Sequence, residues 1–287
     1  MIQSMKNASI AASAKIAPSV IICDNVYIGE NVTIGENVFL DIGCIIRDNV
    51  TIGKGSKIGA RCILGEHLQD FYEGITNKNH PLIIGEDALI RSETIIYGDC
   101  VIGNGFQTGH RVTIREGTHI GNHTRVGTLS DIQGACEIGD YVNLHSNVHI
   151  ARASKLCDYV WIFPYVVLTN DPQPPSEMLS GVEVKEFAVI ATGTVVLPGV
   201  RIGKDAMVGA GSVVTRDVPD EMTAFGNPAK THGNVKNILR KDGASAYPWR
   251  NHFERGMPWA GIGYETWIKQ QSKIAESGTS MRTLEGG

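Results

Sequence analysis

Residues 84–173, written in groups of six, read IGEDAL, IRSETI, IYGDCV, IGNGFQ, TGHRVT, IREGTH, IGNHTR, VGTLSD, IQGACE, IGDYVN, LHSNVH, IARASK, LCDYVW, IFPYVV and LTNDPQ. An aliphatic residue heads every group except one, which begins with Thr108. A period of six matches neither the 3.6-residue period of a helix nor the alternation of a half-buried strand. Short fixed repeats are typical of solenoids, in which each unit buries its apolar side by stacking on its neighbours.

Three such groups make one coil of a β-helix with three flat sides. The aliphatic first position points inward, the polar second to fourth positions make the turn, and the fifth position holds mostly small or β-branched residues, with Phe106 as an exception. Side chains eighteen residues apart are then neighbours on adjacent coils. The sequence therefore predicts an all-β solenoid of about ten triangular coils.

Two interruptions predict loops. The same pattern has its first positions at residues 10, 16, 22 and onward to 64, but resumes at 84, so residues of about 70–83 are inserted. A second insertion at about 174–183 contains PPSEMLSG and precedes the groups that restart at Val184. Counting sides places both loops at one corner, five coils apart, or about 24 Å. Loops of this length in a compact solenoid are functional or disordered.

The repeat ends near Val218, which predicts a β-helix domain of residues 1–218 and a C-terminal tail of 219–287. Residues 246–259 mix aromatic residues with prolines, and Tyr264, Trp267, Ile268 and Ile274 recur at helical spacing, which predicts a short helix near 262–275. Two interpretations of the tail remain open. It caps the solenoid or lies on a neighbouring subunit, or it stacks an aromatic ring on a ligand.

Composition excludes several classes of protein. Lys and Arg number 26 against 30 Asp and Glu, a net charge of −4, so no basic face for nucleic acid is expected. The first residues contain no long apolar run, so we expect neither a signal peptide nor a membrane span, and a cytoplasmic location. Four cysteines occupy the small fifth position, which indicates core residues; they are Cys44, Cys62, Cys100 and Cys136.

Polar residues gather in columns of the expected stack. The groups IGEDAL, IGNGFQ, IGNHTR and IGDYVN read as plain scaffold on one side, so the site is expected on the other two. One column runs through Thr113, Asp131 and His149, and a carboxylate beside an imidazole can orient a general base. The alternative is a polar ladder on a solvated or subunit-facing side. Two further columns are Ser92, His110, Thr128 and Ser146, and Gly98, Glu116, Gly134, Arg152 and Asn170.

The hexad pattern resembles the left-handed parallel β-helix of the hexapeptide-repeat acyltransferases, and the left hand is implied by that resemblance. Residues 196–230, VLPGVRIGKDAMVGAGSVVTRDVPDEMTAFGNPAK, are similar to the closing segment of the CoA-dependent acetyltransferases of this fold. The resemblance implies a homotrimer that binds acyl-CoA between subunits, with no metal. It assigns CoA contacts to Thr192, Ala210, Thr215 and Arg216, and a guanidinium suits a phosphate. Ordinary turn chemistry is the alternative for these positions.

A second motif narrows the acceptor. Residues 92–121 and the TND of 169–171 are similar to nucleotide-sugar N-acyltransferases, which modify amino-dideoxy sugars for surface glycans. This resemblance places Asn170 at the acceptor amine. Those relatives carry a glutamate after Ile-Pro, where this chain has Arg152 after Ile150 and Ala151, and an arginine prefers a carboxylate or phosphate.

The catalytic base has several candidates. The galactoside and xenobiotic acetyltransferases carry a histidine just past the TND position, where this chain has Gln173. The base is then His149 or His145, a water molecule, or the substrate itself. Another four residues lie farther from the expected CoA end and are assigned to the sugar or its phosphates; they are Arg91, His110, Arg115 and Glu116.

Together these features predict a CoA-dependent acyltransferase, with acetyl as the expected acyl group, that acts on the amino group of a nucleotide-linked amino sugar. O-acetylation of a sugar or other small molecule is an alternative. A zinc enzyme resembling the γ-class carbonic anhydrases is another, since His110, His145 and His149 are spaced 35 and 4 residues apart. A catalytically silent scaffold subunit is the third.

Overall fold

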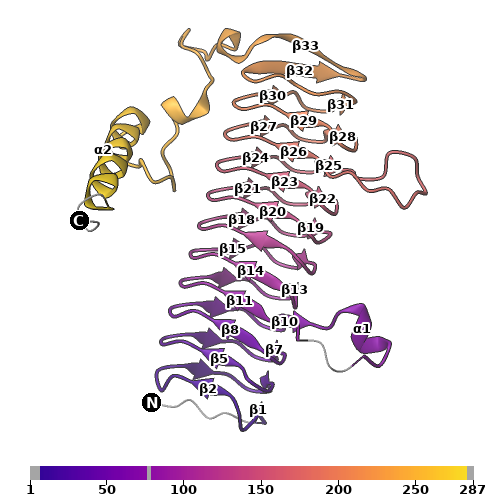
Figure 1. The fold of residues 1–287 in the computed structure, drawn as a ribbon, viewed down its shortest axis with the longest axis vertical. Helices are drawn as coiled ribbons and strands as arrows, with labels where there is room; N and C mark the ends of the chain where they lie inside the picture. Colours follow the sequence, from indigo (N-terminus) through magenta and orange to yellow (C-terminus); the bar gives the residue numbers. More distant parts are fainter. Residues whose placement is uncertain (1–6, 76–78, 283–287) are drawn as a thin grey trace. The chain divides into compact units, whose positions relative to one another are not determined.

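The computed structural model describes residues 7–75 and 79–282, which form two units that divide between Gly233 and Asn234. The first unit is a parallel β-helix (Figure 1). Each coil contributes one short strand to each of three sheets. Neighbouring strands of a sheet are three places apart in the chain, except at the end of face C, where β32 follows β30 and β33 follows β32. The sheets have 11, 10 and 12 described strands, so two of the three exceed the ten coils that the sequence predicts. We call them faces A, B and C.

Face A contains β1 (Ser9–Ile10), β4 (Tyr27–Ile28), β7 (Ile45–Ile46), β10 (Ile63–Glu66), β13 (Ile95–Tyr97), β16 (Thr113–Ile114), β19 (Asp131–Ile132), β22 (His149–Ile150), β25 (Val167–Leu168), β28 (Val195–Val196) and β31 (Val213–Val214). Face B contains β2 (Lys15–Ile16), β5 (Thr33–Ile34), β8 (Val50–Ile52), β11 (Leu82–Ile84), β14 (Cys100–Ile102), β17 (His119–Ile120), β20 (Glu137–Ile138), β23 (Lys155–Leu156), β26 (Glu183–Val184) and β29 (Arg201–Ile202). Face C contains β3 (Ile21–Ile22), β6 (Phe39–Leu40), β9 (Lys57–Ile58), β12 (Leu89–Ile90), β15 (Gln107–Thr108), β18 (Arg125–Val126), β21 (Asn143–Leu144), β24 (Trp161–Ile162), β27 (Val189–Ile190), β30 (Met207–Val208), β32 (Met222–Gly226) and β33 (Ala229–Asn234).

The six-residue period follows from this geometry. The aliphatic first position is the second residue of a strand and is buried, as at Ile114 and Ile132. The small fifth position is buried in the turn, and the fourth position takes a positive φ to turn the corner, as at Asn147 with a φ of 59°. Thr108, which breaks the aliphatic pattern, is also buried, and its Oγ1 accepts a hydrogen bond from the backbone N–H of Arg91 at 2.9 Å.

The four fifth-position cysteines are buried and unpaired, as the sequence predicts. Burial raises the pKa of Cys44 and Cys100 to about 12, and that of Cys62 and Cys136 to about 11. These thiols stay protonated at neutral pH and pack as small apolar groups.

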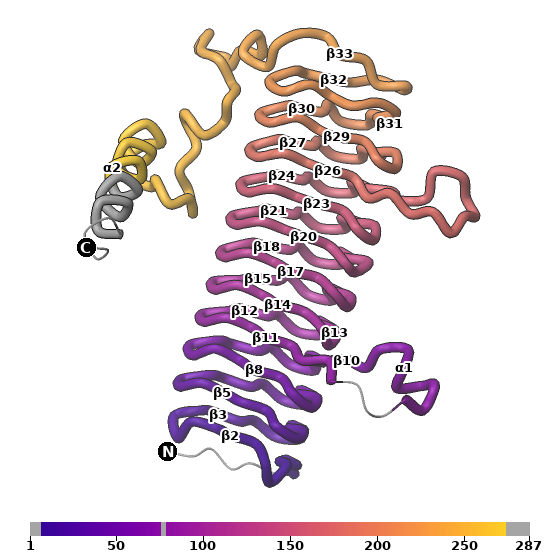
Figure 2. Tube along the Cα trace, in the orientation of Figure 1, coloured from indigo at the N-terminus to yellow at the C-terminus, as the bar shows by residue number. Residues whose placement is uncertain are grey.

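Both inserted loops leave the same corner. The first runs from β10 on face A through the short helix α1 (Gln69–Tyr72) to β11 on face B, and the second runs from β25 on face A to β26 on face B. Five strand steps of face A separate β10 from β25, which matches the count made from the sequence. In Figure 2 both loops project from one side of the β-helix.

The end of the β-helix differs from the boundary expected at residue 218. Strands β32 and β33 continue face C past that point, and the two units divide between Gly233 and Asn234. The first-position pattern is lost there because the chain stays on one face instead of passing to the next.

The second unit contains the 3-10 helices η1 (Val235–Asn237) and η2 (Trp249–Asn251) and the helix α2 (Tyr264–Arg282). Helix α2 is longer than the segment near 262–275 that the sequence predicts, and the side chain of Ile274 lies outside the described residues. The ring of Trp259 lies 5.1 Å from that of Tyr264 and 5.5 Å from that of Trp267, so the tail aromatics pack on one another. None of the helices described in either unit has the length and apolar character to cross a membrane.

Candidate functional site

A histidine and a carboxylate meet on face A. Asp131 in β19 and His149 in β22 are register partners on adjacent coils, and His149 Nδ1 lies 3.2 Å from Asp131 Oδ2. Both side chains are partly exposed, 38% for His149 and 34% for Asp131, so a ligand can reach them. The side-chain amide of Gln133 donates a second hydrogen bond to Asp131.

The environment of Asp131 favours its ionised form. Partial burial opposes ionisation, but the hydrogen bonds from His149 and Gln133 and the charges of His149 and Arg115 outweigh it and lower the pKa of Asp131. A charged carboxylate at Nδ1 favours the tautomer with its proton on Nδ1, which leaves Nε2 as an acceptor. The pair can therefore hold a general base in the orientation that proton removal requires.

Beside this pair, at the corner between faces A and B, two arginines share one carboxylate. Glu116 accepts hydrogen bonds from Arg115 at 3.0 and 3.1 Å, and Arg152 NH1 lies 3.3 Å from Glu116 Oε1. Arg115 also lies over the ring of Tyr97, 5.5 Å from its centroid. The cluster carries one net positive charge, which suits an anionic group of a ligand.

Gly134 lies one coil from both Glu116 and Arg152. It has a φ of +96°, and a Cβ there would lie 2.7 Å from the carbonyl oxygen of Glu116, closer than a Cβ can be accommodated. It would also lie 3.3 Å from the Cβ of Arg115 and 3.5 Å from Arg152 Nη1. A side chain at position 134 would therefore crowd the coil that carries Arg115 and Glu116.

Asn170 continues the same column one coil further. Its side-chain amide is 3.4 Å from the carbonyl oxygen of Arg152, so the structure brings together the residues that the column predicts. The next residue, Asp171, accepts hydrogen bonds from the Ser176 hydroxyl at 2.6 Å and from the backbone N–H of Gln173 at 3.0 Å. These bonds fix the start of the second loop beside Asn170.

His145 lies apart from His149, although the two are four residues apart in sequence. His145 follows β21 on face C, and its ring stacks on Phe163 with centroids 4.6 Å apart. Burial lowers the pKa of His145, so its imidazole is neutral at pH 7. The turn between β21 and β22 separates it from His149, so the two do not form one catalytic pair within a chain.

The three histidines of the zinc hypothesis do not converge within one chain either. His110 and His145 line a groove on face C, whereas His149 faces Asp131 on face A. In the described part of the chain, no group of three or more His, Cys, Asp or Glu side chains is arranged to hold a metal ion.

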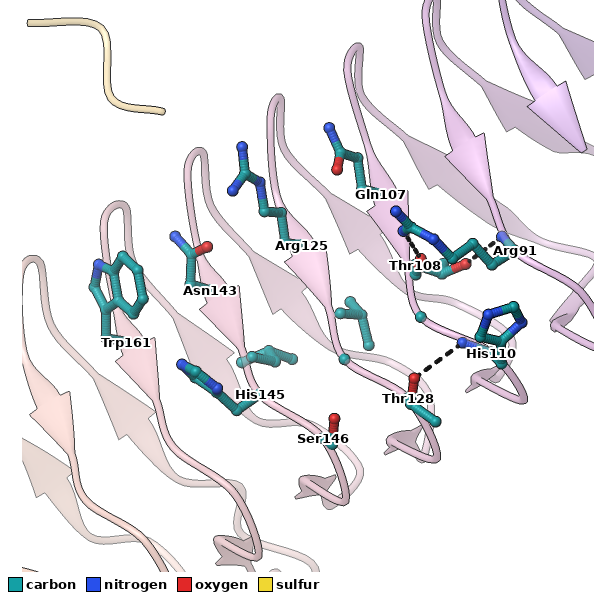
Figure 3. Close-up of a pocket in the computed structure, with 14 residues that line it drawn as sticks. Arg91, Gln107, Thr108, His110, Arg125, Thr128, Asn143, His145, Ser146 and Trp161 are labelled. Carbon is teal, nitrogen blue, oxygen red and sulfur yellow. Dashed lines mark hydrogen bonds between the residues drawn. The ribbon is translucent and has the colours of Figure 1, made fainter. Parts of the chain in front are cut away.

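The face C groove has a volume of about 450 Å³ and is shown in Figure 3. It contains Arg91 and His110, which the sequence assigns to a sugar or its phosphates, and also Arg125, Asn143 and Trp161, which the sequence analysis missed. These three occupy the sixth position of their groups. That position is the outward residue that begins the next strand; it is exposed at Arg125, half-buried at Trp161 and buried at Asn143. The last residues of IGNHTR and IGDYVN, which the sequence predicts as scaffold, therefore lie on another side of the β-helix.

The residues assigned to CoA lie in the last coils and are exposed. Thr192 and Ala210 are neighbours at the corner between faces C and A, where the backbone N–H of Gly211 donates to the Thr192 carbonyl at 2.9 Å. Thr215 and Arg216 follow β31, at the corner between faces A and B. The four residues therefore flank face A on both of its edges.

Comparisons with known proteins agree with the repeat. A model of the bacterial transferase hexapeptide (six repeats) matches residues 31–66 and 117–152. The acyl-[acyl-carrier-protein]–UDP-N-acetylglucosamine O-acyltransferase of Burkholderia orbicola is 36% identical over 138 residues, 48% of this chain and 47% of that protein. The dTDP-3-amino-3,6-dideoxy-α-D-galactopyranose 3-N-acetyltransferase of Aneurinibacillus thermoaerophilus is 52% identical over 58 residues, 20% of this chain and 30% of that protein. The chain thus spans about half the length of the first of these relatives, and less of the second.

Among solved structures, the UDP-N-acetylglucosamine O-acyltransferase of Moraxella catarrhalis superposes with a TM-score of 0.51 at 24% identity, over 97% of this chain and 93% of that chain. This likeness concerns the fold alone. The fold is the left-handed parallel β-helix that the resemblance implies.

Proposed function

The chain is a hexapeptide-repeat protein of the bacterial transferase type, and from this premise we propose that it is an acyltransferase that moves an acetyl group from CoA to the amino group of a nucleotide-linked amino sugar. The observation that carries the proposal is the pair of Asp131 and His149 on an open face, next to Arg152 and Asn170. The relative from Aneurinibacillus, whose name describes N-acetylation of a dTDP-linked amino sugar, supports the choice of acceptor.

In the proposed reaction, the amine nitrogen of the acceptor attacks the thioester carbonyl carbon while His149 Nε2 takes a proton from it. Backbone N–H groups stabilise the oxyanion. The carbon–sulfur bond then breaks, the electron pair goes to sulfur, and the imidazolium returns the proton to the thiolate of CoA. The products are an amide and free CoA.

The remaining polar residues are proposed to bind the two substrates. The side-chain oxygen of Asn170 accepts a hydrogen bond from the acceptor amine. Arg115 and Arg152, neutralised in part by Glu116, hold an anionic group of the acceptor, and the net charge of this cluster disfavours an ammonium group there. Thr192, Ala210, Thr215 and Arg216 are proposed to contact CoA, with Arg216 at a phosphate.

A second candidate is O-acylation of a UDP-linked sugar by an acyl group on acyl carrier protein. The Burkholderia relative, whose name describes that reaction, is similar over 138 residues, a longer stretch than the N-acetyltransferase matches. The donor therefore distinguishes the two candidates.

The test is a thiol-release assay with acetyl-CoA and a panel of UDP-, dTDP- and GDP-linked amino sugars, with the product identified by mass spectrometry. Acyl carrier protein loaded with an acyl group is assayed in parallel against UDP-N-acetylglucosamine. Transfer of one acetyl group to an amine is expected. Transfer only from the carrier protein favours the second candidate, and no transfer from either donor contradicts both.

A further inference from the structure

A trough on face C has a floor made by glycine. In the register of this face, Arg91, Gly109, Gly127 and His145 form one column on four successive coils. A Cβ on Gly109 would lie 2.3 Å from the backbone nitrogen of Thr128, and one on Gly127 would lie 2.4 Å from the carbonyl carbon of His145. Because only glycine fits at these two coils, no side chain fills the middle of the column, and the trough opens between Arg91 and His145.

Two rows of polar side chains form the walls (Figure 3). One row is Gln107, Arg125, Asn143 and Trp161, which are register partners on adjacent coils of face C. The other row is His110, Thr128 and Ser146, at the corner that leads to face A. The walls of the trough therefore follow from the eighteen-residue register of the stacked coils.

The ionisable side chains that line the trough are all basic. Its lining residues, all within the described part of the chain, include two arginines and two histidines and no Asp or Glu. Two smaller cavities by contrast have carboxylates beside their basic residues: Asp48, Glu66 and Asp70 beside α1, and Glu137, Asp158 and Glu186 on face B. The absence of carboxylates favours an anionic ligand.

The two ends of the trough differ in chemistry. At one end the Arg91 guanidinium is oriented by a hydrogen bond from Nη1 to the Thr108 carbonyl at 2.6 Å, and Arg125 follows two coils further along the wall, in the middle of the trough. At the other end the rings of His145 and Trp161 lie together, with centroids 6.1 Å apart. Arginines suit phosphates, and aromatic rings suit the flat face of a base.

We infer that this trough binds a nucleoside diphosphate, with its phosphates at Arg91 and Arg125 and its base against Trp161 and His145. Three coil steps separate Arg91 from His145, about 14 Å at the usual strand spacing, which accommodates a base, a ribose and two phosphates in extended form. The volume of about 450 Å³ lies in the range of small-molecule sites. The inference rests on the proposed function in naming two sources for this chemistry, the nucleotide of the acceptor and the ADP portion of CoA.

The test is isothermal titration of the full-length protein, without an acyl donor, with UDP, dTDP and GDP, and separately with CoA and ADP. Arg125→Gln is expected to weaken nucleotide binding at least about tenfold, the effect of losing one charge-assisted hydrogen bond. Lys57→Gln is the matched control, because Lys57 is an exposed cation in the same column, two coils beyond Gln107 and outside the trough. It should bind like the wild type.

Two outcomes overturn the inference: no binding of any nucleotide at millimolar concentration, or equal affinity of wild type and Arg125→Gln. Inorganic pyrophosphate is the ringless probe, and pyrophosphate binding as tight as nucleotide binding also contradicts it, because the base would then contribute nothing. Trp161→Phe should weaken nucleotide binding and leave pyrophosphate binding unchanged.

The ligands that lose affinity in Arg125→Gln identify the source. Loss for UDP, dTDP or GDP assigns the trough to the acceptor, and loss for CoA and ADP assigns it to the donor; either supports a nucleotide site. Acetyl transfer without nucleotide binding to this trough contradicts the inference and leaves the proposed function standing. Nucleotide binding without transfer from any donor does the reverse.

Discussion

A second histidine–carboxylate pair lies elsewhere in the β-helix. Comparing variants of the two histidines distinguishes a catalytic role for His149 from a polar ladder. His119 and Glu137 on face B are also register partners eighteen residues apart, with Nδ1 and Oε1 at 3.1 Å. The two pairs share the same local geometry. They differ in their surroundings, because Asp131 also accepts a hydrogen bond from Gln133, and the chain passes directly from His149 to Arg152, whose carbonyl oxygen lies 3.4 Å from the Asn170 amide.

We predict that His149→Ala lowers kcat of acyl transfer by about a hundredfold or more, the usual contribution of a general base. His119→Ala removes an equivalent histidine from face B and should leave kcat unchanged. The measurement is the rate of thiol release as a function of pH for both variants. Similar rates and pH profiles for wild type and His149→Ala would remove His149 from the mechanism and favour the polar ladder.

Gly134 is the second residue whose role can be isolated. We predict that Gly134→Ala lowers the free energy of unfolding by about 1–3 kcal/mol, because the residue has a φ of +96° and the new Cβ would lie 2.7 Å from the Glu116 carbonyl oxygen. Gly193→Ala is the control, since Gly193 has a φ of +71° and nothing within 4 Å of its Cβ position. Urea denaturation measures both. An equal loss in the two variants would mean that backbone strain alone, and not the close approach to the Glu116 carbonyl oxygen, sets the cost.

At the scale of the strands, the sequence predicts the coil well because the first position of each group of six must be apolar and buried. The inward residue of each two-residue strand must be apolar, as at Ile114, Ile132 and Ile150, so its recurrence reveals every strand and the register between coils. The contacts of Asp131 with His149 and of Arg152 with Asn170 follow from that register alone. Both were predictable without coordinates.

The trough was not predictable from the same pattern. The outward residue of each strand is free to vary in type, so Arg125, Asn143 and Trp161 share no residue class that would mark them as a group. They also belong to a different face from the polar turn that precedes them, because the chain rounds a corner within each group of six. Two signals were present in the sequence: glycines at 109 and 127, eighteen residues apart, and outward residues at 107, 125, 143 and 161 with the same spacing.

His145 and His149 lie on different faces because the chain rounds a corner between them. A spacing of four residues places two side chains on one side of a helix, but in this coil it spans a corner between two faces. The tail shows a different limit. Helical spacing of Tyr264, Trp267 and Ile268 reveals helix α2, yet its end at Arg282 follows no apolar signal.

For the whole molecule, the proposed site implies a particular assembly. The residues assigned to CoA flank both edges of face A, and the base lies on that face, so a substrate held there would be open to solvent in one chain alone. We therefore predict a homotrimer in which a neighbouring subunit covers the site. Light scattering after size-exclusion chromatography should give a mass of about 93 kDa, three times 31.0 kDa.

Dilution gives the matching functional measurement. If the site needs a neighbour, activity per chain should fall at the concentration at which the mass falls. A monomer of full activity would contradict the shared site and would leave the chemistry of His149 to be explained within one chain.

The two loops at one corner have a consequence for how such a protein can change. The two loops are separated by a whole number of coils, so the number of eighteen-residue coils between them sets the distance between the loops. Duplication or loss of one coil between β10 and β25 would change the distance between the loops by about 4.8 Å and leave the stacking of every other coil intact. Relatives that act on longer or shorter substrates could therefore arise by a change in the number of coils, without change to the rest of the β-helix.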